Sequence, residues 1–203
     1  MDTLNKRQQS ALKTREKIIE ASRQILMETG FDDVSVSDIT AKAKVSTGSF
    51  YTYFKRKEDV IDELNRADFL KLSEIVNQMQ DLKFIQRLEY YCTSFMKGIE
   101  RSGVKICRQW IKNHLSSEKV PLYNNCSKFE YDTRALKSVF DEGIKRGELA
   151  FNTPVEKLVL TINAQLYGLM IIWCMTDTGI VGSDYTEEFI SDFLNQLLKN
   201  YLK

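Results

Sequence analysis

Proline and glycine are scarce in this chain, which holds 2 Pro and 9 Gly among its 203 residues. Because these residues mark turns, their scarcity excludes a fold of many short strands, and it also excludes collagen-like and low-complexity chains. The 43% of hydrophobic and 28% of charged residues are typical of a globular chain, long enough for one large domain or two small ones. The composition therefore predicts an all-α fold of long helices.

Histidine and closely spaced cysteines are also lacking. The chain has one histidine, His114, and 4 Cys without a C-x-x-C pair. This set does not supply the spacing of a structural zinc site, so we expect no bound metal. The polar N-terminal segment has no apolar core of a secretory signal, which predicts a reducing, cytoplasmic compartment. We therefore expect the cysteines to be buried as small hydrophobic residues.

No charge of one sign dominates, because 29 Lys and Arg stand against 28 Asp and Glu. The net charge of +1 gives no bulk attraction to nucleic acid or membrane, so such a function needs a local patch. The sequence also lacks a nucleophile with a base, a set of metal ligands and a glycine-rich phosphate loop at usable spacing. We therefore expect neither an enzyme nor a cofactor.

One long run without charge is present, from Leu158 to Thr176. It is about as long as a membrane-spanning helix. Thr161, Asn163 and Gln165 interrupt it, and both flanks are short and mixed in charge, which disfavours a membrane span. The preferred interpretation is a helix buried on most sides, in a domain core or in a subunit interface. We therefore expect no membrane partner.

The first quarter of the chain predicts three helices. The first runs from about residue 14 to 29, and Gly30 ends it as a left-handed cap. Ser35 begins a short second helix, and Ser46 caps a short third helix that extends through Phe54. Two short helices joined by a tight turn, behind a longer helix, are typical of a helix-turn-helix unit. The further predicted helices span about 58–79, 82–101, 104–116, 128–146, 154–176 and 185–202.

The third helix has two different faces. Phe50 and Phe54 share one face and are expected to anchor the helix in the core. The other side carries small hydroxyl residues and tyrosines, which offer donors and acceptors to phosphates and to base edges in the major groove of DNA. Alternatively, these hydroxyls are only helix caps and the tyrosines only pack at the rim. The residues alone leave both interpretations open.

The segment VSDITAKAKVSTGSFYTYFKRKEDV, behind a first helix that ends TGF, resembles the N-terminal domain of the TetR family of bacterial transcriptional regulators. The turn EGIKRGEL at 142–149 and the all-helical remainder are also similar to that family. Two positions depart from the pattern, because Lys44 stands where glycine is common and Thr40 stands where alanine is usual. The first departure affects the turn between the two short helices.

The resemblance implies a ligand-responsive transcriptional regulator, most often a repressor, which a small hydrophobic or aromatic effector releases from a palindromic DNA operator. It divides the chain into a helix-turn-helix domain, 1–57, and a ligand-binding and dimerisation domain, 58–203. Within the first domain we expect 1–13 to be a disordered arm, with a basic arm that reaches DNA as the alternative. Two alternatives to the function remain, an activator of the same fold and a helical ligand-binding or scaffold protein without DNA binding.

The resemblance also implies particular site residues in this sequence. The expected contacts with double-stranded DNA are Thr14, Arg15, Ser37, Thr47, Gly48, Ser49, Tyr51, Tyr53 and Lys57. The expected interface of a homodimer lies on the final helix at Phe189, Phe193, Leu194 and Leu197, although burial of this stripe within a monomer is the alternative. Aromatic and sulfur side chains of the middle helices are expected to line an effector cavity, namely Tyr91, Phe95, Trp110, Phe129, Phe140, Tyr167, Met170 and Trp173.

Overall fold

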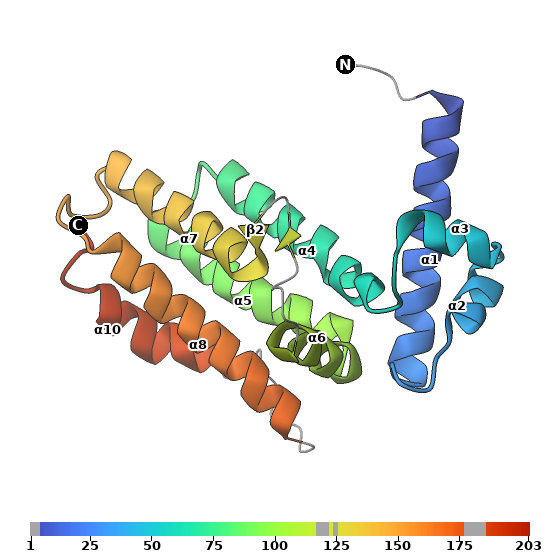
Figure 1. The fold of residues 1–203 in the computed structure, drawn as a ribbon. Helices are drawn as coiled ribbons and strands as arrows, with labels where there is room; N and C mark the ends of the chain where they lie inside the picture. Colours follow the sequence, from blue (N-terminus) through green and yellow to red (C-terminus); the bar gives the residue numbers. More distant parts are fainter. Residues whose placement is uncertain (1–4, 117–121, 124–125, 177–185) are drawn as a thin grey trace. The chain divides into compact units, whose positions relative to one another are not determined.

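The computed structural model describes residues 5–116, 122–123, 126–176 and 186–203. Most of these residues are helical, which confirms the predicted all-α fold class (Figure 1). The helices are α1 (Lys6–Glu28), α2 (Val36–Ala43), α3 (Thr47–Tyr53), α4 (Asp59–Gln78), α5 (Phe84–Ser102), α6 (Val104–Ser116), α7 (Lys128–Lys145), α8 (Val155–Met175), the π-helix η1 (Phe189–Leu194) and α10 (Asn195–Leu198).

One small sheet precedes α7. It consists of β1 (Leu122–Tyr123) and β2 (Cys126–Ser127), which pair antiparallel with Leu122 opposite Ser127 and Tyr123 opposite Cys126. The sequence did not predict these strands, because two residues are too few to show the alternation of a strand. Ser127 ends the pair and caps α7, since its side chain accepts a hydrogen bond from the backbone N–H of Glu130. The strand pair thus leads directly into α7.

The chain forms two compact units. Unit 1 comprises Met1–Arg66 and Ser102–Ser116, and unit 2 comprises Ala67–Arg101 and Ser117–Lys203. Unit 1 thus extends past residue 57, where the sequence placed the boundary, because it includes the first part of α4 and the whole of α6. Helix α4 is continuous, so it belongs to unit 1 at its start and to unit 2 at its end.

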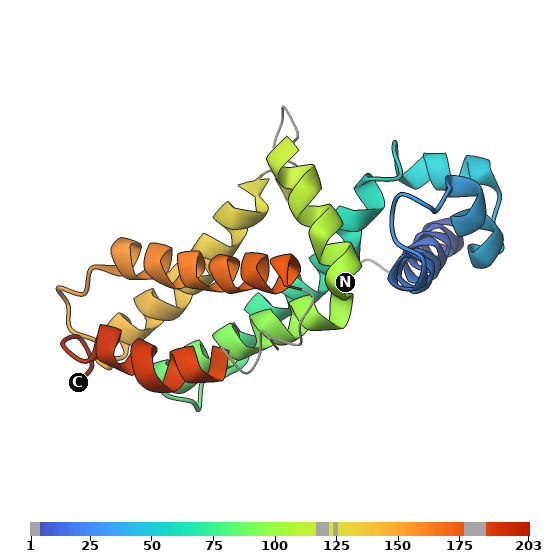
Figure 2. The ribbon, with the colours of Figure 1, turned by 90° about the horizontal axis from the view of Figure 1, so that it is seen from below.

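Unit 1 is built on α1, which packs against α2, α3 and α6. Figure 2 looks along α1 and shows α2 and α3 on the same side of it. Phe50 and Phe54 are both buried, with ring centroids 5.3 Å apart, so the expected anchoring of α3 is confirmed. Ile18 and Ile39 complete this core from α1 and α2, and neither exposes any surface.

Helix α1 begins earlier than the sequence suggested. Asn5 and Gln8 form a capping box, in which each side chain accepts a hydrogen bond from the other residue's backbone N–H. Residues 6–13, expected as a disordered or basic arm, therefore form the first turns of α1. Residues 1–4 of that expected arm lie outside the described residues.

Capping also sets the start of α2 and α3. Ser35 and Asp38 form a capping box, and the hydrogen bonds from the side chain and backbone of Ser35 lower the pKa of the Asp38 carboxyl. Ser46 caps α3 by accepting a hydrogen bond from the N–H of Ser49. Between the two helices, Lys44 adopts the left-handed conformation with φ 55° and ψ 46°, which glycine adopts with less strain.

Unit 2 packs α5, α7 and α8 around an apolar core. Helices α7 and α8 lie against each other, as both ribbon views show (Figures 1 and 2). Gly143 of α7 allows a close approach, because a Cβ atom there would stand 2.7 Å from the ring of Phe84. The fully buried side chains of this core include Phe84, Leu88, Phe95, Met96, Leu136, Phe140, Ile162 and Leu166.

The final helical segment differs from the regular helix expected over 185–202. After the α-helical residues 186–188 it continues as the π-helix η1, in which hydrogen bonds join residues five apart instead of four. The residues buried within the chain are accordingly Phe189, Leu194 and Leu198, spaced by five and four positions. Phe193 is left 54% exposed. Residue 185 lies outside the described residues.

Candidate DNA-binding surface and effector core

Helix α3 presents a polar outer face. Thr47, Tyr51 and Thr52 are exposed, and Tyr51 is 55% accessible although it is a large aromatic residue. Thr52 donates a hydrogen bond to the carbonyl of Gly48 at 3.0 Å, so its hydroxyl is engaged within the helix. Among the described residues, the hydroxyls of Thr47 and Tyr51 have no hydrogen-bond partner. These two groups are available to a bound molecule.

Gly48 keeps this outer face open. A Cβ atom at this position would meet nothing closer than the Ser46 hydroxyl at 3.8 Å, so packing inside the protein does not require glycine. The missing side chain instead allows the backbone of another molecule to approach the start of α3. The hydroxyls of Ser46 and Ser49 lie 2.9 Å apart, which makes Ser49 a partner of the helix cap.

The remaining expected DNA contacts surround α3. Ser37 is exposed near the start of α2, and Tyr53 is half-buried at the end of α3. Thr14 donates a hydrogen bond to the carbonyl of Ser10 at 3.0 Å. Arg15 forms an ion pair with Glu63, so part of its charge is already neutralised within unit 1. Thr14 and Arg15 are therefore less available to phosphates than the exposed hydroxyls of α3.

Lys57 differs from the free phosphate-binding cation that the sequence suggested. Its ammonium donates hydrogen bonds to the carbonyls of Phe31 at 2.7 Å and Val34 at 2.6 Å. It also lies 4.0 Å from the centroid of the Phe31 ring, in cation–π geometry. The lysine thus ties the segment before α4 to the loop between α1 and α2. Its carbonyl partners lie more than twenty positions away, which is why local spacing did not show them.

Lys55 follows α3 and is not among the expected DNA contacts. It is exposed and forms no ion pair within the described part of the chain, whereas Arg56 pairs with Asp59 at 3.3 Å. The Asp59 carboxylate also accepts hydrogen bonds from the backbone N–H groups of Lys55 and Arg56. Of the three consecutive cations after α3, Lys55 is therefore the one that is free to meet a phosphate.

Four of the expected effector residues meet in unit 2. The ring centroid of Phe95 lies 6.5 Å from that of Tyr91 and 5.7 Å from that of Tyr167. Phe129 contacts Tyr167 with its centroid 5.9 Å away. We call these four residues, contributed by α5, α7 and α8, the aromatic cluster. Tyr91 and Phe95 are buried, while Phe129 is 43% exposed.

A buried polar network adjoins the aromatic cluster, and sequence analysis missed it. Lys128 forms an ion pair with Asp132, and Tyr167 donates a hydrogen bond to the same carboxylate at 2.7 Å. The Lys128 ammonium also lies 5.1 Å from the centroid of the Phe95 ring. Burial lowers the pKa of Lys128, while the charge of Asp132 opposes that shift. The four-residue spacing of the pair was visible in the sequence, but its burial was not.

Asn163 adds an unpaired acceptor to this part of α8. Its side chain exposes no surface, and its Nδ2 donates a hydrogen bond to the Thr133 hydroxyl at 3.1 Å. Within the described part of the chain, its Oδ1 atom is buried without a hydrogen-bond partner. Leaving such an atom unpaired costs free energy, so a ligand that supplies a donor here gains affinity.

The other expected effector residues lie elsewhere. Phe140 packs against Phe84, with ring centroids 4.9 Å apart. Trp110 belongs to unit 1, where it stacks on His114 at 3.9 Å. Met170 is buried, and Trp173 is half-buried near the end of α8. The structure thus brings together half of the expected set.

Helix α8 has an apolar face that unit 2 does not cover. Its side chains Leu160, Ile171, Ile172 and Met175 are between 39% and 77% exposed. By length and composition, α8 is the one helix of the described residues that is apolar enough to cross a membrane, and 44% of its most apolar window is buried. Phe193 of η1 is a further exposed apolar residue, whereas Leu197 is half-buried.

A capped two-helix turn on a packing helix, joined to a larger helical unit, defines a helix-turn-helix DNA-binding regulator. The family model described as bacterial regulatory proteins, tetR family, matches residues 18–64, which include the whole of α2 and α3. Over these residues the chain is therefore similar to the TetR family of bacterial transcriptional regulators.

Two relatives align along most of the chain. The transcriptional repressor DhaR of Mycobacterium sp. (strain GP1) is 28% identical over 89% of this chain and 76% of its own length. The dhaKLM operon transcriptional activator DhaS of Lactococcus lactis is 22% identical, over 91% of this chain and 89% of its own length. The crystal structure of FadR from Bacillus subtilis in complex with stearoyl-CoA shares the fold, with a TM-score of 0.66 and 20% identity. The match covers 88% of this chain and 98% of the FadR chain.

Proposed function

We propose that this protein is a transcriptional repressor that binds a palindromic operator as a homodimer and is released by a small apolar or aromatic effector. The observation that carries the DNA-binding part is the outer face of α3, where the hydroxyls of Thr47 and Tyr51 have no hydrogen-bond partner among the described residues and Gly48 leaves room for an approaching backbone. The repressor DhaR is more similar to this chain than the activator DhaS, which favours repression. Activation by the same fold is the second candidate.

The uncovered face of α8 supports the homodimer. Leu160, Ile171 and Met175 recur at helical spacing on a helix whose other side is buried in unit 2. When a second copy packs on this face across a two-fold axis, both copies bury these same residues, and Phe193 with them. A membrane would have to surround α8, yet close to half of its most apolar window is already buried against the protein. The dimer therefore accounts for this face without a membrane, and we infer a cytoplasmic protein.

The aromatic cluster and its polar network support the effector site. Phe95 and Tyr167 provide an apolar surface, while Asp132, Lys128 and Asn163 provide the few polar groups that orient a ligand. The solved FadR complex contains stearoyl-CoA, which is an example of a partly apolar ligand on this fold. We propose that the effector of this protein contacts the cluster with an apolar group and donates a hydrogen bond to Asn163.

A gel-shift series on the duplex upstream of the protein's own gene tests the DNA-binding face. We expect Tyr51→Ala to weaken binding at least about tenfold, the equivalent of one lost contact of about 1.4 kcal/mol. Lys145→Ala, on an exposed side chain of α7 in unit 2, is the matched control and should bind as the wild type does. Equal binding by Tyr51→Ala and the control would exclude α3 as the recognition helix.

A further inference from the structure

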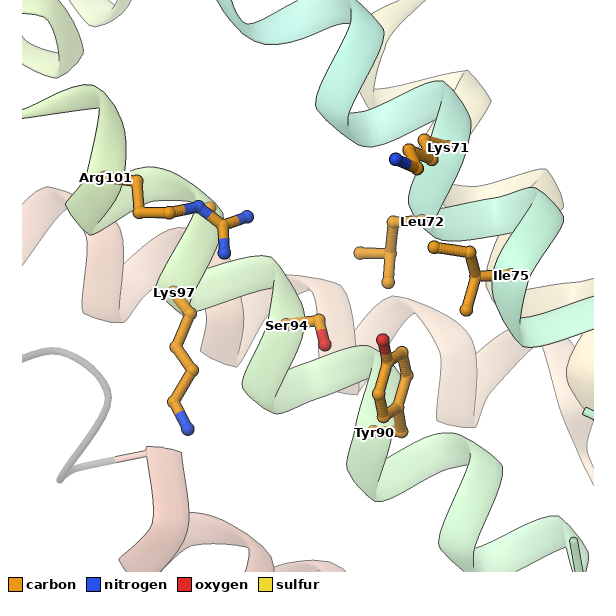
Figure 3. A pocket seen from close by; sticks show the side chains of 8 residues that line it. Lys71, Leu72, Ile75, Tyr90, Ser94, Lys97 and Arg101 are labelled. Carbon is orange, nitrogen blue, oxygen red and sulfur yellow. The ribbon is translucent and has the colours of Figure 1, made fainter.

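A cavity lies outside the aromatic cluster, between α4 and α5 in unit 2. Its volume is about 270 Å³ (Figure 3). Lys71, Leu72 and Ile75 enter it from α4, and Tyr90, Ser94 and Arg101 are among the residues that enter it from α5. Typical ligand pockets measure roughly 300–1,000 Å³, so this cavity suits a small ligand.

One end of the cavity is cationic. Lys71 and Arg101 lie on the two facing helices, and Figure 3 shows the guanidinium of Arg101 extended from α5 toward the side where Lys71 stands on α4. Lys97 lies one helical turn before Arg101 and adds a like charge at the unfavourable four-residue spacing. Among the described residues, no carboxylate lines the cavity and none of these three cations forms an ion pair. A bound anion would relieve this repulsion.

The rest of the cavity is apolar with two hydroxyls. Leu72 is 6% exposed and lies beside the half-buried Ile75. Figure 3 shows the Tyr90 hydroxyl directed toward these two side chains, and the Ser94 hydroxyl between Tyr90 and the cationic end. A molecule with an apolar part on Leu72 and Ile75 would therefore have its charged end near Lys71 and Arg101.

Gly98 is an independent indication of a ligand. It lies inside α5, where glycine destabilises a helix relative to alanine. Packing does not require it, because a Cβ atom there would have only the Arg101 guanidinium nearby, at 3.8 Å. The missing side chain instead keeps the cavity open between Ser94 and Arg101.

We infer that this cavity binds a small amphipathic anion, a carboxylate or phosphate monoester on a short apolar chain. The site is separate from the aromatic cluster, since Tyr90 and Ser94 face the cavity whereas their neighbours Tyr91 and Phe95 are buried in the cluster. Binding itself does not depend on the proposed repressor function. Only its consequence does, because α4 runs from this cavity into the unit that contains α3.

Calorimetric titration of the full chain tests the site with octanoate, octyl phosphate, octanol and inorganic phosphate as probes. We expect one octanoate or octyl phosphate per chain, with octanol at least about tenfold weaker because it lacks the charge. Inorganic phosphate should also be at least about tenfold weaker, because it lacks the apolar part. Equal affinity for octanol and octanoate would overturn the inference, as would equal affinity for inorganic phosphate and octyl phosphate.

Variants locate the site. Lys71→Gln and Arg101→Gln should each weaken octanoate binding about tenfold, whereas Lys145→Gln makes the same charge change elsewhere and should not. Gly98→Leu should abolish binding by filling the cavity, and Gly98→Ala should raise the melting temperature while the fold persists. Octanoate affinity that survives Gly98→Leu would overturn the inference, as would binding to anionic phospholipid vesicles without binding of octanoate. The affinity of the same variants for operator DNA, measured in the absence of octanoate, tests the proposed function separately.

Discussion

At the scale of single residues, Lys57 stabilises the fold next to α3, the proposed DNA-binding helix. We predict that Lys57→Met, which keeps the aliphatic stem, lowers the free energy of unfolding by about 1–3 kcal/mol, because the carbonyls of Phe31 and Val34 lose their charged donor. Lys55→Met is the matched control, and it should change that free energy by less than about 0.5 kcal/mol while weakening DNA binding. Urea unfolding and a DNA-binding titration measure the two effects. Unchanged stability of Lys57→Met would contradict the hydrogen bonds assigned to it.

Cys92 gives a prediction about alkaline pH. Burial, reinforced by the charge of Glu89, raises the pKa of its thiol from 9.0 to about 12. The unfolded chain then loses the thiol proton first, so stability contributed by the protonated thiol is complete below pH 9.0 and is lost as pH rises toward about 12. Between these pH values the free energy of unfolding of the wild type should fall more steeply than that of Cys92→Ala, by about 1.4 kcal/mol per pH unit. Parallel stability curves for the two proteins, from urea unfolding at several pH values, would refute the shift.

At the scale of elements, the π-helix η1 decides which side chains of the final segment face the core. Leu194 is fully buried within the chain, whereas Phe193 is 54% exposed and belongs to the proposed dimer face. We predict that Phe193→Arg gives a folded monomer, because an unpaired charge in an apolar interface has to be desolvated. Leu194→Arg should instead unfold the protomer, since the charge would enter its own core. Sedimentation velocity and circular dichroism distinguish these results, and a folded, dimeric Phe193→Arg would contradict the interface.

The elements also show what the sequence could and could not predict. The caps at Ser35 and Ser46 and the burial of Phe50 follow from local spacing, so the helix-turn-helix was predictable. The apolar stripe of the final segment was too wide to predict which of its side chains face the core. The π-helix η1 determines this. The partners of Lys57 and the place of α6 in unit 1 depend on contacts between distant positions, which no local pattern carries.

The candidate site was predictable to a different degree in its two parts. The outer face of α3 follows from helical spacing, because burial of Phe50 and Phe54 leaves Tyr51 outside. The effector residues were selected as aromatic side chains on predicted helices, and that criterion does not say which helices meet. It therefore included Trp110, which lies in the other compact unit, and missed the buried charge of Lys128.

At the scale of the whole molecule, the proposed repressor couples two binding events. An effector can release DNA only by its differential affinity for the two states of the protein, typically about 1–3 kcal/mol or about 5- to 150-fold. We predict by reciprocity that operator DNA weakens effector binding by the same factor. Titration of a confirmed effector against free and DNA-bound protein checks this, and equal affinities would show that the compound does not induce release.

The central claim is that a dimer of this chain presents two α3 helices to DNA, and footprinting on the region upstream of its own gene tests it most directly. We predict two protected half-sites related by two-fold symmetry, with centres about 34–36 Å apart, or one turn of DNA. The protection should weaken steeply as salt concentration rises, because many of the contacts are to phosphates. The Tyr51→Ala variant should lose both half-sites together. A single protected half-site, or protection that Tyr51→Ala leaves unchanged, would contradict the account.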